Sequence, residues 1–211
     1  TGSYSCMSLI TMLLFDRSSE EDKAAWVETA AKMGEEVVAR EAEIADFLDC
    51  DFNRMTYLGS GAFGGLAQES QLKILELARG LVATSWDTSM GYRHGPKSFV
   101  DDKTLVFVFV NNDAYTRQYD LDILEEIDGD GIAMKTIAVQ QAGETGFDRA
   151  SFTFEGYDAL PEGYLALPFV MVGQTVSLLN SVRVGNKPDT PSPTGTVNRV
   201  VKGVTIHPYG E

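Results

Sequence analysis

The sequence predicts an α/β protein built on a doubly wound parallel sheet flanked by helices. Strand-like and helix-like segments alternate from residue 54 onward, which is typical of a parallel sheet with helices on both faces. Residues 103–110 form a continuous apolar run, as expected for a strand buried on both faces. A glycine-rich turn at residues 59–65 joins the first predicted strand to its helix.

The segment before residue 54 is expected to be helical. Residues 9–15 look like the end of a packed helix, and Ser18-Ser19-Glu20-Glu21 is a helix start of the capping-box type. Apolar residues then recur at helical spacing as far as Leu48. We therefore expect residues 20–48 to form one long amphipathic helix with a solvated acidic face.

The remaining elements follow in order along the chain. We expect strands at 55–59, 81–86, 103–110 and 132–140, and helices at 63–79, 115–126 and 167–183. Right-handed crossovers would distribute these helices over the two faces of the sheet. The Pro-rich residues 186–195 cannot form regular structure, so they predict an extended arm that ends in a strand-like segment at 200–207.

Composition excludes several classes of function. The 211 residues include 31 Asp and Glu but only 17 Lys and Arg, and the net charge of −14 argues against a nucleic-acid partner. No apolar run approaches the roughly 20 residues of a membrane span, and no secretory signal is evident. Cys6 and Cys50 are too few for a disulfide framework and lack metal-ligand spacing. We expect a cytoplasmic protein that binds no metal and no membrane.

The glycine turn has two interpretations. Gly59, Ser60 and Gly61 lie between a strand and a helix, where backbone N–H groups and the helix dipole can hold an anion. Together with Gly64 they match G-x-G-x-x-G, but no acidic strand end follows about 20 residues later, so a dinucleotide site is weakly supported. A tight turn that needs glycine for packing explains the pattern equally well.

Polar residues of the following helix and loop are candidates for proton transfer. Glu69, Lys73 and Glu76 are spaced to share one helix face, although spacing alone favours a solvated row of ion pairs. His94 lies in a turn forced by Gly95 and Pro96, where a titrating imidazole suits proton transfer. On their surroundings alone, His207 and Lys202 in the tail are ordinary surface residues.

Several segments together resemble the SIS (sugar isomerase) domain of the phosphosugar isomerases. The matching residues are 57–61, 72–76, 91–98, 115–120 and 193–206. The resemblance spans nearly the whole chain and is strongest to the members that act on galactosamine 6-phosphate or are labelled tagatose-6-phosphate ketose/aldose isomerase. It implies a flavodoxin-like SIS domain that needs no cofactor.

The resemblance also implies roles for individual residues. The more distant isomerase half of glucosamine-6-phosphate synthase has a Lys-x-x-Glu helix, a His-Gly-Pro loop and a tail lysine, which Lys73 and Glu76, His94 and Lys202 match. There the glutamate moves a proton between C1 and C2, the histidine helps to open the ring across a dimer interface, and the tail lysine acts near the sugar oxygens. The residues expected to bind substrate are Gly59, Ser60, Gly61, Arg93 and Ser5.

The implied activity is conversion of galactosamine 6-phosphate to tagatose 6-phosphate with loss of ammonia, by a homodimer or higher homo-oligomer. Two alternatives stay open: ketose/aldose isomerisation without deamination, and a regulatory module that only binds a hexose or hexosamine 6-phosphate. By the same resemblance, residues 1–16 are the terminal helix of a first SIS domain, 17–50 are a linker helix, and 51–211 are a second SIS domain with its arm. The main phosphate loop would then belong to the first domain, so the chain alone is expected to be incomplete as an enzyme.

Overall fold

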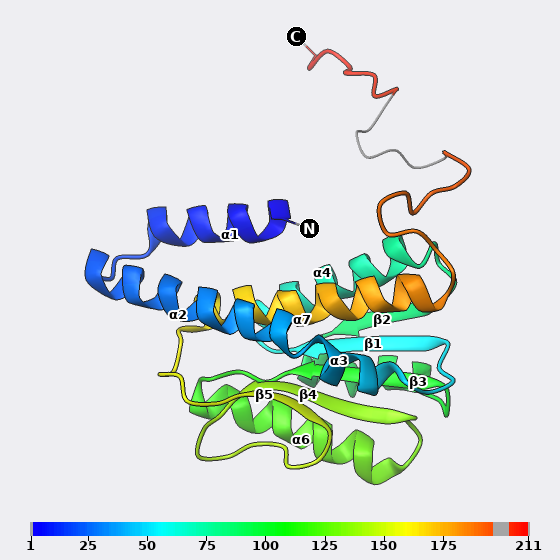
Figure 1. Cartoon of the computed structure of the whole chain (residues 1–211), viewed down its shortest axis with the longest axis horizontal. Helices are drawn as coiled ribbons and strands as arrows, with labels where there is room; N and C mark the ends of the chain where they lie inside the picture. Colours follow the sequence, from blue (N-terminus) through cyan, green and yellow to red (C-terminus); the bar gives the residue numbers. More distant parts are fainter. Residues whose placement is uncertain (1, 196–202, 211) are drawn as a thin grey trace.

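The structure, a computed structural model, describes residues 2–195 and 203–210 (Figure 1). Its centre is an all-parallel sheet of five strands in the order β2-β1-β3-β4-β5. The strands are β1 (Arg54–Gly59), β2 (Ala83–Asp87), β3 (Thr104–Phe109), β4 (Lys135–Gln141) and β5 (Ser151–Phe154). This order confirms the doubly wound sheet, with the direction of winding reversing between β1 and β3.

Helices cover both faces of the sheet. They are α1 (Gly2–Phe15), α2 (Glu20–Ala39), α3 (Glu41–Leu48), α4 (Ala62–Leu77), α5 (Ser89–Tyr92), α6 (Ala114–Asp130) and α7 (Glu162–Arg183), with a short 3₁₀ helix at Pro96–Phe99. In Figure 1, α4 and α7 lie against one face together with α2 and α3, while α6 lies against the other. The outermost layer is α1, which packs on α7.

The main hydrophobic core lies between the sheet and the layer of α4 and α7. Phe169 of α7 stands at its centre, and its ring contacts those of Phe63, Phe109 and Phe154. A smaller core lies under α6. Every residue of β3 is buried, as its apolar sequence predicts. By length and composition α7 could cross a membrane, but 61% of the apolar window is buried here, as in the core helix of a globular domain.

The prediction of one continuous helix over residues 20–48 is wrong. The helix breaks at Arg40, whose φ of −102° and ψ of 23° separate α2 from α3. The break redirects the chain so that α3 packs against α7 and buries Ile44 and Leu48. Helical spacing of apolar residues continues through such a bend, because each short helix keeps its own apolar face.

Two further differences concern strands. The edge strand β5 was not predicted, since its four residues are too short for a periodic pattern. The strand-like segment expected at 200–207 is not a strand in the part that is described: residues 203–207 have no regular structure, and Ile206 is 89% exposed. Residues 200–202 lie outside the described residues. The other predicted strands and helices are present, with ends that differ by up to five residues.

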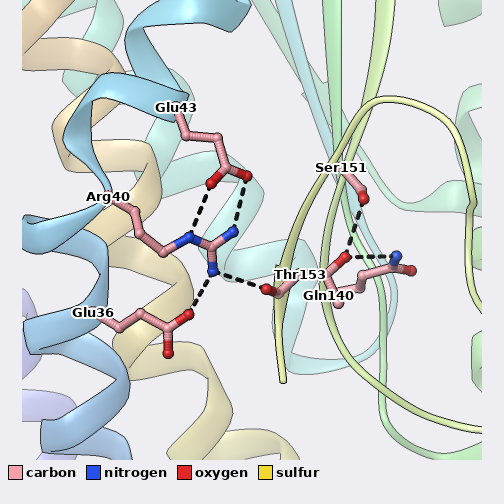
Figure 2. Close-up of polar contacts among 6 residues, drawn as sticks. All are labelled: Glu36, Arg40, Glu43, Gln140, Ser151 and Thr153. Carbon is pink, nitrogen blue, oxygen red and sulfur yellow. Dashed lines mark hydrogen bonds and ion pairs between the residues drawn. The ribbon is translucent and has the colours of Figure 1, made fainter. Parts of the chain in front are cut away.

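Arg40 ties the helical N-terminal region to the edge strand β5 (Figure 2). Its Nε and Nη2 atoms donate to the carboxylate of Glu43 at 2.9 and 2.8 Å, and Nη1 also bonds Glu36. Nη1 donates to the carbonyl oxygen of Thr153 in β5 at 2.9 Å, and the guanidinium lies 4.0 Å from the ring centroid of Phe152. An edge strand presents unpaired backbone groups, and Arg40 covers one of them.

We expect Arg40→Met to lower the free energy of unfolding by about 1.5–3 kcal/mol, the range for hydrogen bonds to a charged group. The substitution keeps the apolar stem, leaves the Thr153 carbonyl without this donor, and leaves Glu36 and Glu43 to repel each other. Urea unfolding measures the change. The matched control is Lys32→Met, because Lys32 also pairs with a glutamate one turn away but is 60% exposed; a change within about 0.5 kcal/mol is expected there. Equal effects in both variants would contradict the role of Arg40.

Candidate active site

Helix α4 brings Lys73 together with two carboxylates. The Lys73 ammonium lies 2.5 Å from Oε2 of Glu76 and 3.7 Å from Oε1 of Glu69, which confirms that the three residues share one face. The side chain of Lys73 is only 13% exposed, whereas that of Glu76 is 48% exposed. The arrangement therefore offers a carboxylate that a ligand can reach beside a cation held in place by the protein.

Tyr4 of α1 lies near this row of charges. Its side chain is half-buried and packs against the main core. Burial, and next the negative charge of Glu69, raise the pKa of the Tyr4 hydroxyl. No sequence pattern singled out Tyr4, because its proximity to Glu69 joins α1 to α4 across more than 60 residues.

His94 lies on the opposite side of the sheet from Lys73 and Glu76. It is exposed in the loop after α5, a helix that packs against α6. Arg93 and Lys97 fasten this loop to α6: the Arg93 Nε lies 2.9 Å from Glu126 Oε2, and Lys97 pairs with Glu126 and Asp130. Figure 1 shows α4 and α6 on opposite faces of the sheet. Because α5 packs against α6, a single chain does not bring His94 to the Lys73–Glu76 pair of α4.

The glycine turn and the Lys73–Glu76 pair stand toward opposite ends of α4. From Ala62 to Glu76 the helix rises about 21 Å at 1.5 Å per residue. Gly59 is required for packing, since a Cβ there would lie 2.7 Å from the Cβ of Phe63. Gly61 has a φ of +59°, which favours glycine. Packing against Phe63 therefore explains glycine at 59, and the backbone conformation explains glycine at 61.

Ser60, the middle residue of the turn, bonds a buried carboxylate of its own chain. Its Oγ donates to Oδ1 of Asp120 in α6 at 2.6 Å. Asp120 also accepts from the Ser89 hydroxyl and, at 2.9 Å, from the backbone N–H of Asn111. Burial raises the pKa of Asp120, although these three hydrogen bonds act in the opposite direction. The Ser60 hydroxyl therefore has a structural partner.

The raised pKa of Asp120 predicts a pH-dependent contribution to stability. Ionisation costs more in the folded than in the unfolded protein, so the penalty is absent below the ordinary carboxyl pKa of about 3.9 and grows as pH rises through the higher folded value. Asp120→Asn cannot ionise. We expect its free energy of unfolding, relative to wild type, to increase with pH in urea titrations. A pH-independent difference would contradict the shift.

The two remaining candidate residues are Ser5 and Lys202. Ser5, on α1, lines an apolar groove of about 370 Å³ between α1, α2 and α7. Lys202 falls outside the described residues.

A second, polar hollow of about 460 Å³ lies beside Arg40 and β5. Within residues 2–195 and 203–210, no group of three His, Cys, Asp or Glu is placed to hold a metal ion.

The chain is similar to several curated proteins, although no protein-family model matches it. It is 46% identical over 172 residues to a protein of Escherichia coli named D-galactosamine-6-phosphate deaminase AgaS, which covers 75% of the chain and 41% of that protein. It is 35% identical over 210 residues to the protein of the same name from a Shewanella species, covering 99% of the chain and 50% of the relative. It thus spans about half the length of the curated relatives it matches.

A solved structure of the same family also resembles this chain in fold. The tagatose-6-phosphate ketose/aldose isomerase of Escherichia coli superposes with a TM-score of 0.83 at 34% identity, over 100% of this chain and 54% of that one. The doubly wound sheet and this likeness define the chain as an SIS-type domain. It belongs to the SIS phosphosugar isomerase family, and its sequence relatives there are the galactosamine-6-phosphate deaminases named AgaS.

Proposed function

We propose that this chain is part of a cytoplasmic phosphosugar isomerase that converts galactosamine 6-phosphate to tagatose 6-phosphate and ammonia. The observation that carries the proposal is the Lys73–Glu76 pair, a reachable carboxylate 2.5 Å from the ammonium of a largely buried lysine side chain. The names of the 46% identical relatives, galactosamine-6-phosphate deaminases, support the choice of substrate.

In the proposed reaction Glu76 is the acid and base. It removes the proton from C2 of the open-chain amino sugar and returns a proton to C1. The C1 oxygen also gains a proton and the C2 nitrogen loses one, so the C1 aldehyde becomes a hydroxymethyl group and the C2 amine becomes an imine. Water then hydrolyses the imine, releasing ammonia and leaving the C2 ketone of tagatose 6-phosphate. The Lys73 ammonium stabilises negative charge that develops on the sugar oxygen during the proton transfer.

Residues that are not on the exposed face of α4 complete the proposed site. His94 helps to open the sugar ring, and its position on the opposite side of the sheet supports delivery from a second copy in a homodimer or higher oligomer. Lys202 adds positive charge from the tail. The ion pair of Arg93 with Glu126 of α6 supports a structural role for Arg93 in the isolated chain. Ser5 lines the groove between α1, α2 and α7 and stays a candidate for substrate binding.

We propose the division of the chain into residues 1–16, 17–50 and 51–211 on the same basis. Helix α1 has no buried residue, although it carries a row of apolar side chains. Those exposed are Met7, Ile10, Leu13, Leu14 and Phe15. A helix of this kind is expected to pack against a further domain, and the matched relatives are about twice as long as the chain.

The deciding experiment is an assay of the full-length protein against a panel of hexose and hexosamine 6-phosphates. Ammonia release from galactosamine 6-phosphate together with appearance of tagatose 6-phosphate supports the proposal. Interconversion of tagatose 6-phosphate with its aldose, without ammonia release from any amino sugar, would favour simple isomerisation. Binding without turnover would favour a regulatory module.

A further inference from the structure

Two helix N-termini converge beside the switch point of the sheet. After β1 the chain enters α4 on one face, and after β3 it enters α6 on the other, so the carboxyl ends of these strands border the crevice where doubly wound folds bind ligands. The N-terminus of α7 meets that of α4 there, since the first residues of the two helices, Glu162 and Ala62, are hydrogen-bonded. Helix N-termini favour negative charge, so the backbone builds a place for an anion.

That place is occupied by the carboxylate of Glu162. Its Oε1 accepts a hydrogen bond from the backbone N–H of Ala62 at 2.6 Å and another from Nδ2 of the buried Asn111 at 2.9 Å. A Cβ on Gly61 would collide with this carboxylate, so glycine at 61 permits the close approach. One side chain thereby uses the contacts that a phosphate oxygen would need.

Three neighbouring hydrogen-bond donors of the turn also have partners within the chain. The N–H groups of Phe63 and Gly64 bond the carbonyl oxygens of Ser60 and Gly61, at 3.0 and 3.1 Å. The Ser60 hydroxyl donates to the buried carboxylate of Asp120. These three donors are therefore already used within the chain.

Charge opposes a phosphate at the same place. Asp120 lies beneath the turn, and Glu162 is near enough for its charge to act on Asp120. An incoming phosphate group would meet two carboxylates of the chain, at a site already filled by one of them.

We propose that Glu162 is an internal substitute for a ligand phosphate, which closes the anion site at the β1–β3 switch point and excludes sugar phosphates from the Gly59–Gly61 turn. This role goes beyond the proposed function and does not depend on which reaction the protein catalyses. It differs from the sequence-based expectation that Gly59, Ser60 and Gly61 bind the substrate. Glu162 thus determines where on this domain a phosphate cannot bind.

Inorganic phosphate, titrated into the ¹⁵N-labelled chain and followed by NMR, tests the proposal. In wild type, the resonances of the Ala62 N–H and the Asn111 side-chain amide should not move with millimolar phosphate. In Glu162→Ala both should shift saturably, with phosphate bound at least about tenfold more tightly than the limit that the unshifted wild-type resonances set, the scale of a favourable, partly buried interaction at a helix N-terminus. The matched control is Glu20→Ala, which removes the same charge from the first residue of α2 and should behave as wild type.

Three results would overturn the proposal: a phosphate-dependent shift of Ala62 in wild type, no shift in a folded Glu162→Ala variant, or an equal shift at Ala62 in the Glu20→Ala control. Circular dichroism and thermal unfolding establish whether the variant is folded. Should it not fold, the wild-type titration still decides: a shift of Ala62 refutes the proposal, and its absence with slow hydrogen exchange of that amide supports it. Ammonia release plays no part in these measurements, so failure of the proposed reaction is distinguishable from failure of this inference.

Discussion

Glu76→Gln in the full-length protein should lower turnover of galactosamine 6-phosphate by at least about 10²-fold. The amide keeps the size of the side chain and can still accept a hydrogen bond from Lys73, 2.5 Å away in the wild-type chain. It cannot take up the C2 proton at neutral pH, so the proposed reaction loses its base. The measurement is kcat for ammonia release at saturating substrate.

The chain offers a matched control for this variant. Glu28 on α2 also pairs with a lysine, Lys32, one helical turn away at 2.7 Å, and it is exposed. Glu28→Gln should leave kcat close to wild type. Near wild-type turnover in Glu76→Gln would contradict the catalytic role of Glu76, and would leave Lys73 and Glu76 as a surface ion pair of the kind that their spacing alone predicts.

Phe169→Ala is expected to lower the free energy of unfolding by about 3–5 kcal/mol, the range for removing a buried phenylalanine. The ring centroid of Phe169 lies 5.3 Å from that of Phe63, 6.0 Å from Phe109 and 5.8 Å from Phe154. The variant would therefore leave a cavity where α7, α4 and two strands meet. Urea unfolding of the chain, followed by circular dichroism, gives the value.

Phe15→Ala is the control for this substitution. Phe15 ends α1 and is 79% exposed in the chain, so its removal should change stability by no more than about 0.5 kcal/mol. Comparable losses in the two variants would show that the aromatic cluster around Phe169 is not the centre of the core. Phe169→Leu should fall between the two, because it fills part of the cavity.

Most of the fold follows from local patterns. The unbroken apolar sequence of β3 predicts burial on both faces, and the glycine turn after β1 marks the start of α4. The two features that the sequence did not predict, the helix break and the edge strand β5, have a common cause. A helix break at Arg40 and a four-residue edge strand leave almost no periodic signal, because contacts between distant segments stabilise them.

In the candidate site, too, residue spacing predicts some features and tertiary packing decides the others. Helical geometry places Lys73 and Glu76 on one face whatever the rest of the chain does. The separation of His94 from that pair depends on which face of the sheet each crossover covers, and the nearness of Tyr4 to Glu69 depends on how α1 packs. Neither could be read from residue spacing.

The sequence by itself determined the class of fold and the Lys73–Glu76 pair, because the order of local strand and helix patterns predicts the first and helical spacing predicts the second. Only the tertiary structure decided what the glycine turn binds. Glu162 lies 100 residues after Ala62, yet its carboxylate occupies the N-terminus of α4. This contact forms when α7 packs beside α4 over the main core. It therefore depends on the assembled sheet and has no local sequence signature.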